Sequence, residues 1–173
     1  VYGLSQNKWA AVVFTGSGTS AMEAMITSLV PLHGKVLIIE NGVYGERLTK
    51  IAKIHNIDHV VIHHEWEEEI NIENLNNELK YHKEISHVAI VQHETTTGRL
   101  NNIKEVADVC KKNRNISLLV DAVSSFGAEE LKFDEWNIAA CASSANKCLH
   151  GVPGTSFVVV NRSATKSMAA TSA

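Results

Sequence analysis

The chain has 173 residues, of which 45% are hydrophobic and 20% are charged, and its formal net charge is −3. These values are typical of one globular domain with a core of its own. The slightly acidic balance offers no basic surface for nucleic acid, and no apolar run reaches the ~18 residues that would cross a bilayer. We therefore expect neither nucleic acid nor a membrane as a partner.

Three cysteines, Cys110, Cys141 and Cys148, form an odd number without CxxC spacing. That pattern fits a reducing cytoplasm better than a disulfide framework. The first residue is Val1 rather than Met, and no charged-then-apolar signal peptide follows it. We expect a cytoplasmic protein and an internal fragment of a longer chain.

Seven short runs rich in valine and isoleucine recur along the chain. They predict strands over 10–14, 35–40, 59–64, 87–92, 116–122, 138–144 and 155–161. Helical periodicity separates most of them, over 19–31, 44–56, 73–82 and 102–114. Continuous apolar runs are typical of strands that are covered on both faces.

This alternation predicts an α/β three-layer sandwich with a mixed, mostly parallel sheet of about seven strands. The last two strands have no helix between them, so we expect them to be antiparallel. Residues 163–173 are small and polar and predict a disordered tail, which leaves 1–162 as the domain core.

Ligands of parallel α/β sheets bind where the carboxyl ends of strands lead into loops. The first such end is the turn FTGSGTSAMEAM, whose free N–H groups at a helix start would attract phosphate. Gly16, Gly18 and Ala21 also satisfy G-x-G-x-x-G/A, and Glu40 ends the next strand about 20 residues later, as in dinucleotide binders. A capped turn without any ligand is the third interpretation.

Two isolated charges follow later strands. Asp121 ends the apolar run LLVD, where a carboxylate needs a cationic or hydrogen-bonding partner, such as a protonated ring nitrogen. Lys147 stands among small neutral residues in SSANKCLHGVPG. A lysine amine that loses its solvation is more often neutral and therefore nucleophilic. A turn-stabilising aspartate and a solvated surface lysine are the structural alternatives.

Together these features match the three fixtures of a pyridoxal phosphate site: a phosphate cradle, an acid for the pyridine nitrogen and a lysine for a Schiff base. A nicotinamide site has no use for this lysine or this aspartate. The combination therefore favours pyridoxal 5'-phosphate as the cofactor over a dinucleotide.

Six segments extend the pattern over nearly the whole chain. They read FTGSGTSAMEAMI, NGVYGERL, HHEW, HETTTGRLN, VDAVSSFGAEEL and SSANKCLHGVPGTSFVV. In this order they resemble the 2-aminoethylphosphonate–pyruvate aminotransferases. These belong to class V of the fold-type I pyridoxal phosphate enzymes, with alanine–glyoxylate and serine–pyruvate aminotransferases as relatives.

The resemblance implies a role for each matching residue. Lys147 would form the Schiff base and move the proton, and Asp121 would pair with the pyridine nitrogen. The other implied cofactor contacts are Ser17, Gly18 and Thr19 with Asn146 at the phosphate, Tyr44 and Val123 on the two ring faces, and Thr95 at the phenolic oxygen. Thr96 and Thr97 leave the register of that last contact open.

The resemblance also implies an activity: transamination of 2-aminoethylphosphonate with pyruvate in phosphonate catabolism, giving phosphonoacetaldehyde and alanine. It implies a homodimer whose partner subunit lends a phosphate contact, and a substrate-binding arginine in a C-terminal part beyond this region. The chain is thus expected to be the large-domain core, truncated at both ends. Another class V aminotransferase, or an inactive cofactor-binding fragment, remains the alternative.

Other side chains carry weaker signals. Nine histidines invite a metal hypothesis, and His63, His64 and Glu67 lie close together, but no H-E-x-x-H or paired CxxC spacing is present. We expect no metal. A catalytic role for Cys148 has no paired base in the sequence, and His93 is at most a polar neighbour of Thr95.

Overall fold

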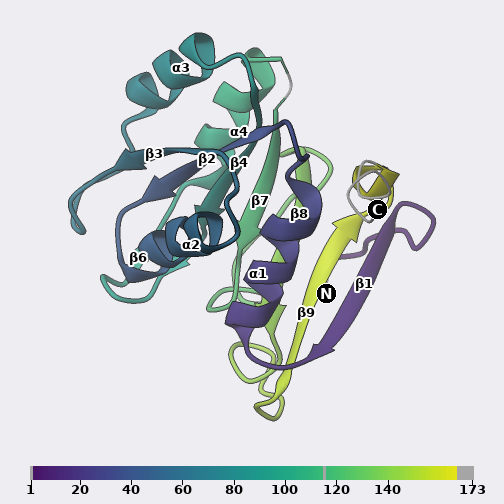
Figure 1. Cartoon of the computed structure of the whole chain (residues 1–173). Helices are drawn as coiled ribbons and strands as arrows, with labels where there is room; N and C mark the ends of the chain where they lie inside the picture. The colour runs from purple at the N-terminus through teal and green to yellow at the C-terminus, as the bar shows by residue number, and fades with distance from the viewer. Residues whose placement is uncertain (1, 115, 167–173) are drawn as a thin grey trace.

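A seven-stranded sheet runs through the middle of the computed structural model, which describes residues 2–114 and 116–166 (Figure 1). Its order is β1-β9-β8-β7-β4-β2-β3. The strands are β1 (Trp9–Thr15), β2 (Lys35–Glu40), β3 (His59–His63), β4 (Ile85–Val91), β7 (Ser117–Asp121), β8 (Ile138–Ser144) and β9 (Thr155–Asn161). The helices are α1 (Gly18–Leu29), α2 (Val43–Ile54), α3 (Ile72–Tyr81) and α4 (Ile103–Lys112).

The predicted elements are confirmed, with boundaries that move by no more than two residues. One element was missed: β5 (His93–Glu94) and β6 (Arg99–Leu100) pair as a separate antiparallel hairpin. Strands of two residues are too short to show any periodicity. This hairpin matters below because it carries Glu94 and leads directly into Thr95.

Strand direction decides where a site can form. β2, β3, β4, β7 and β8 are mutually parallel, whereas β9 is antiparallel to both of its neighbours, β8 and β1. The expected antiparallel pairing of the last two strands is therefore confirmed. Because β9 reverses the direction twice, β1 runs the same way as β8. The carboxyl ends of six strands thus lie at one edge of the sheet.

The sheet is the middle of three layers, as predicted. Successive residues of a strand point to opposite faces, so Leu37 and Ile39 join the core under α3 and α4, while Val36 and Ile38 join the core under α1 and α2. Figure 1 shows these two helix pairs on opposite sides of the sheet. Both faces of the central strands are covered, which explains their continuous apolar sequences.

The prediction of two covered faces is wrong for β1. Val12 and Val13 are 46% and 66% exposed. β1 is an edge strand whose only partner is β9, and α1 packs mainly over β8 and β9. The helix layer therefore stops short of this edge.

The two helix pairs begin differently. Asn71 and Asn102 are side-chain N-caps of α3 and α4, accepting hydrogen bonds from the N–H groups of Asn74 and Glu105 at 2.9 and 3.3 Å. By contrast, the N-cap residues of α1 and α2, Ser17 and Gly42, make no side-chain cap. The first N–H groups of these two helices need other partners.

Within the described residues, no helix is long and apolar enough to cross a membrane. Residues 164–166 form a single 3₁₀ turn. The remainder of the predicted tail, from residue 167, lies outside the described residues.

Truncating a central core side chain should destabilise the fold strongly. Leu118 on β7 is fully buried, so Leu118→Ala should lower the free energy of unfolding by about 2–5 kcal/mol through lost burial and a cavity. Urea denaturation measures the change. Leu32→Ala is the control, because Leu32 is 76% exposed and its loss should cost less than about 0.5 kcal/mol. Equal effects of the two changes would contradict this core assignment.

Candidate active site

A pocket of about 230 Å³ opens at the carboxyl edge of the sheet, where the loops after β1, β7 and β8 meet the start of α2. Seven of the nine predicted site residues line it: Ser17, Gly18, Thr19, Tyr44, Val123, Asn146 and Lys147. The other two, Asp121 and Thr95, lie next to lining residues. The shared strand direction thus gathers residues that are up to 130 positions apart in the sequence, counted from Ser17 to Lys147 (147 − 17).

The start of α1 forms one wall of the pocket. Ser17 has an extended backbone (φ −86°, ψ 167°), and no described residue accepts a hydrogen bond from the N–H groups of Ser17, Gly18 or Thr19. The N–H of Gly16 is occupied, since it donates to the carbonyl of Gly154 at 2.9 Å. Three free N–H groups at a helix N-terminus form a site for an anion.

Gly18 is required at this wall for steric reasons. A Cβ at this position would lie 2.7 Å from Cγ2 of Val123. The close approach of α1 to the loop after β7 therefore depends on the absence of a side chain. It also brings the open helix end beside Val123, two residues after Asp121.

Arg47 is a lining residue that the sequence analysis missed. Its Nη1 donates to Oγ1 of Thr19 at 3.3 Å, and its guanidinium lies 4.7 Å from the centroid of the Tyr44 ring. Arg47 adds positive charge beside the start of α1 and contacts the ring of Tyr44. The i, i+3 spacing from Tyr44 on one helix was the signal that could have identified it.

Asp121 lies at the end of β7 and is only 2% exposed. Its Oδ1 accepts a hydrogen bond from the N–H of Val123 at 2.9 Å, and no described residue donates to Oδ2. Burial raises the pKa of this carboxyl to about 7, and the carboxylate of Glu94 adds to the rise, while the Val123 N–H and Arg47 oppose it. A cationic N–H donor at Oδ2 would stabilise the charged form.

Lys147 lies in the loop between β8 and β9. Hydrogen bonds from Ala145 N to Thr155 O (3.0 Å) and from Gly151 N to Ala145 O (2.7 Å) close this loop. The expected loss of solvation is wrong: Lys147 is exposed, and its Nζ has no hydrogen-bond or ion-pair partner among the described residues. Its small neighbours are too short to cover the side chain, so the amine remains accessible from the pocket and from solvent.

Thr95 directly follows the hairpin strand β5, and the three threonines differ in what their hydroxyls contact. The Thr95 hydroxyl lies 3.1 Å from that of Ser124, which lines the pocket. The hydroxyls of Thr96 and Thr97 donate instead to Glu94, to Oε1 and to the backbone carbonyl. Of the three, Thr95 is the one whose hydroxyl contacts a lining residue.

Ser124 and Ser144 are further lining residues, which lie within two of the quoted segments but were given no role. The Ser144 hydroxyl is buried and has no hydrogen-bond partner in the described structure. The carbonyl of Ser124 accepts from the Cys148 thiol at 3.4 Å and lies 3.3 Å from Nδ1 of His93. Cys148 and His93 therefore hold the loops around the pocket.

The dinucleotide interpretation fails on topology. β1 and β2 are separated in the sheet by β9, β8, β7 and β4, so the glycine turn and Glu40 are not on adjacent strands as that fingerprint requires. Glu40 instead lies 3.3 Å from Nδ1 of His63. No group of three or more potential metal ligands occurs within 2–114 and 116–166.

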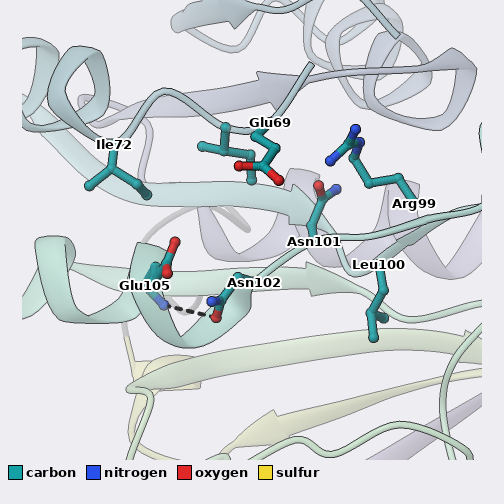
Figure 2. A pocket seen from close by; sticks show the side chains of 8 residues that line it. Glu69, Ile72, Arg99, Leu100, Asn101, Asn102 and Glu105 are labelled. Atoms are coloured by element: carbon teal, nitrogen blue, oxygen red, sulfur yellow. Dashed lines mark hydrogen bonds between the residues drawn. The ribbon is translucent and has the colours of Figure 1, made fainter. Parts of the chain in front are cut away.

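A second cavity, of about 170 Å³, lies between residues 69–72 and 99–105 (Figure 2). Glu69, Arg99 and Glu105 line it, and Arg99 donates a hydrogen bond to the carbonyl of Glu67. None of the nine predicted site residues contributes to this cavity. The two cavities are therefore separate.

Comparison with known proteins gives one consistent result. The family model described as class-V aminotransferase matches residues 3–172. A 2-aminoethylphosphonate–pyruvate transaminase of Bacillus mycoides (strain KBAB4) is 44% identical over 157 residues, which are 91% of this chain and 43% of that protein. The chain therefore spans less than half the length of the curated relatives that it matches.

Solved structures agree on the fold. A ureidoglycine–glyoxylate aminotransferase from Bacillus subtilis superimposes with a TM-score of 0.84 at 30% identity, covering 93% of this chain and 41% of that one. An alanine–glyoxylate aminotransferase from Nostoc sp. has a TM-score of 0.83 at 31% identity, with 92% and 42% covered.

The raised pKa of Asp121 predicts a pH dependence of stability without any ligand. The ordinary pKa of an aspartate is 3.8, and that of Asp121 in the folded state is about 7. Between these two pH values the carboxyl keeps its proton in the folded state but has lost it in the unfolded state. Stability should therefore fall as the pH rises through this window. Between pH 4 and pH 8 the free energy of unfolding of the wild type should fall by on the order of 1–4 kcal/mol more than that of Asp121→Asn. Urea unfolding at each pH measures both.

Asp108→Asn is the matched control. Lys104 lowers the pKa of Asp108 below its ordinary value, so this carboxyl titrates below the window and its loss should leave the decline in place. A decline of the same size in Asp121→Asn would show that another group causes it.

Proposed function

The chain belongs to the class-V aminotransferase family, and on that premise we propose that it is the cofactor-binding part of a pyridoxal phosphate-dependent 2-aminoethylphosphonate–pyruvate aminotransferase. The observation that carries this proposal is the pocket lined by the uncapped start of α1 and the accessible Lys147, with the half-satisfied Asp121 hydrogen-bonded to its lining residue Val123. The name of the 44% identical relative supports the choice of substrates.

The residues present fit pyridoxal phosphate. The free N–H groups of Ser17, Gly18 and Thr19 would hold its phosphate, with Arg47 and Asn146 beside them. The unpartnered Oδ2 of Asp121 would accept a hydrogen bond from the pyridine nitrogen. The buried hydroxyl of Ser144, which has no hydrogen-bond partner within 2–114 and 116–166, is the kind of group that a ligand satisfies.

The ring would lie between Tyr44 and Val123, which both line the pocket. Thr95, through its contact with Ser124, would approach the phenolic oxygen. Lys147 would bind the cofactor aldehyde through Nζ.

When bound, the cofactor supplies an electron sink for the pair released at the substrate carbon. The chain's own residues then have separate tasks. Asp121 would keep a proton on the ring nitrogen, and its burial would strengthen that charge pair because water does not screen it. Lys147 would accept the proton from the substrate carbon at Nζ and return it. Its position on a closed loop fixes where that proton can travel.

The overall reaction would convert 2-aminoethylphosphonate and pyruvate into phosphonoacetaldehyde and alanine. The two structural relatives named above carry glyoxylate in their names, so an alanine–glyoxylate or serine–pyruvate type of activity is the alternative. The whole active protein would be a homodimer. We also propose a cytoplasmic location, which the three free cysteines support.

Lys147 should be the site of covalent attachment. Incubation of the chain with pyridoxal phosphate followed by borohydride reduction should leave a stable adduct on the peptide that contains Lys147. Lys147→Ala should remove it, whereas Lys166→Ala should not, since Lys166 lies outside the pocket. Mass spectrometry of the digested protein maps the label. An adduct distributed over surface lysines would contradict the assignment.

Amino-donor preference tests the reaction itself. With pyruvate and pyridoxal phosphate, 2-aminoethylphosphonate should give alanine faster than serine does. Asp121→Asn should slow this reaction roughly 10²–10⁴-fold, the range for a lost acid–base or charge-stabilising group. Alanine formation is measured by chromatography. Faster turnover with serine would support the alternative activity, and adduct formation without turnover would support an inactive cofactor-binding fragment.

A further inference from the structure

Glu94 is a fully buried carboxylate (0% exposed) that does not line the pocket. It forms no ion pair within the described residues. A buried carboxylate is costly unless hydrogen-bond donors surround it. Its surroundings therefore show what it does.

The donors to Glu94 come from two segments. Its Oε2 accepts from the N–H groups of Tyr44 and Gly45 at 3.1 and 3.2 Å. Its Oε1 accepts from the hydroxyl and the N–H of Thr96 at 2.7 and 3.4 Å. Tyr44 and Gly45 are the second and third residues of α2, the positions that an N-cap side chain normally serves.

Gly42 explains why the cap comes from so far away in the sequence. As the N-cap residue of α2 it has no side chain, and a Cβ there would lie 2.4 Å from both Cγ and Cδ of Glu94. The glycine thus leaves space that the carboxylate fills. Glu94 supplies the missing cap, and its negative charge also suits the positive end of the helix.

This cap connects three parts of the proposed site. The start of α2 carries Tyr44 and, one turn later, Arg47. The residue after Glu94 is Thr95, whose hydroxyl contacts Ser124. Glu94 also acts electrostatically on Asp121, where its charge raises the pKa more strongly than Arg47 lowers it.

We propose that Glu94 is a positioning residue for the cofactor pocket: as the cap of α2 it fixes Tyr44 and Arg47 relative to Thr95 and Asp121. The role in cofactor binding rests on the proposed function, whereas the capping role does not. Glu94→Gln is the direct test, because it keeps the shape and replaces one acceptor oxygen with a donor.

Three measurements distinguish positioning from general stability. In the cofactor-free variant, hydrogen exchange at the Tyr44 and Gly45 amides should be at least about fivefold faster, as expected for a lost cap. The carboxyl of Asp121 should titrate at a lower pH in NMR, because the nearby negative charge is gone. The other groups that act on it, the N–H of Val123 and Arg47 on α2, remain. Affinity for pyridoxal phosphate should fall about tenfold.

Glu46→Gln is the matched control. It removes one carboxylate from the first turn of α2, the helix end that Glu94 caps, yet Glu46 accepts from Trp66 Nε1 and does not line the pocket. It should leave the Tyr44 and Gly45 exchange rates and the Asp121 titration unchanged.

Thr96→Val is the milder variant if Glu94→Gln does not fold. It removes one donor to Glu94 and should speed exchange at the same two amides to a smaller degree. Unchanged exchange and titration in folded Glu94→Gln or Thr96→Val would overturn the proposal. A wild type that fails to bind pyridoxal phosphate would overturn the proposed function, and the cofactor-free exchange would still decide whether Glu94 caps α2.

Discussion

The common direction of six strands is the constraint on which the rest of this structure depends. Because β9 alone runs the other way, β1 joins β2, β3, β4, β7 and β8 in ending at one edge of the sheet. The β8–β9 loop therefore begins and ends at that edge, and it carries Lys147 back over the pocket. Without the reversal at β9, the glycine turn after β1 would lie at the opposite edge from Asp121.

The site also depends on how buried charge is satisfied. Glu94 and Asp121 are both almost completely buried, but among the described residues Glu94 accepts from three backbone N–H groups and one hydroxyl, whereas Asp121 accepts from one backbone N–H. The carboxylate with a full set of donors supports the structure. The incompletely satisfied one has its pKa raised to about 7, and its Oδ2 is the atom to which the proposed cofactor nitrogen would donate. A similar contrast holds for the helices: α2 is capped by Glu94, while α1 is left open to an anion.

Much of the fold could be predicted because the apolar runs of the central strands meet helices on both faces. The same rule failed for β1, since a run such as Val12–Val13 looks alike in a central strand and at an edge. It also missed the hairpin of β5 and β6, which is held by pairing rather than by apolar periodicity. At the site, the sequence identified residues whose charge stands out from their neighbours, such as Asp121 after an apolar strand. Arg47 and Ser144 look ordinary in sequence. The small neutral neighbours of Lys147 favoured a desolvated amine, whereas the structure leaves its side chain exposed.

By itself, then, the sequence determined the order and type of the main elements, the glycine turn and the residues with distinctive chemistry, because these depend on local composition and spacing. Only the tertiary structure decided which of the three threonines contacts the lining residue Ser124, that the glycine turn and Glu40 are on distant strands, and that α2 is capped by Glu94. The physical reason is distance along the chain: Tyr44 and Glu94 are 50 residues apart. No local pattern encodes a contact that exists only once the sheet has brought its strand ends together.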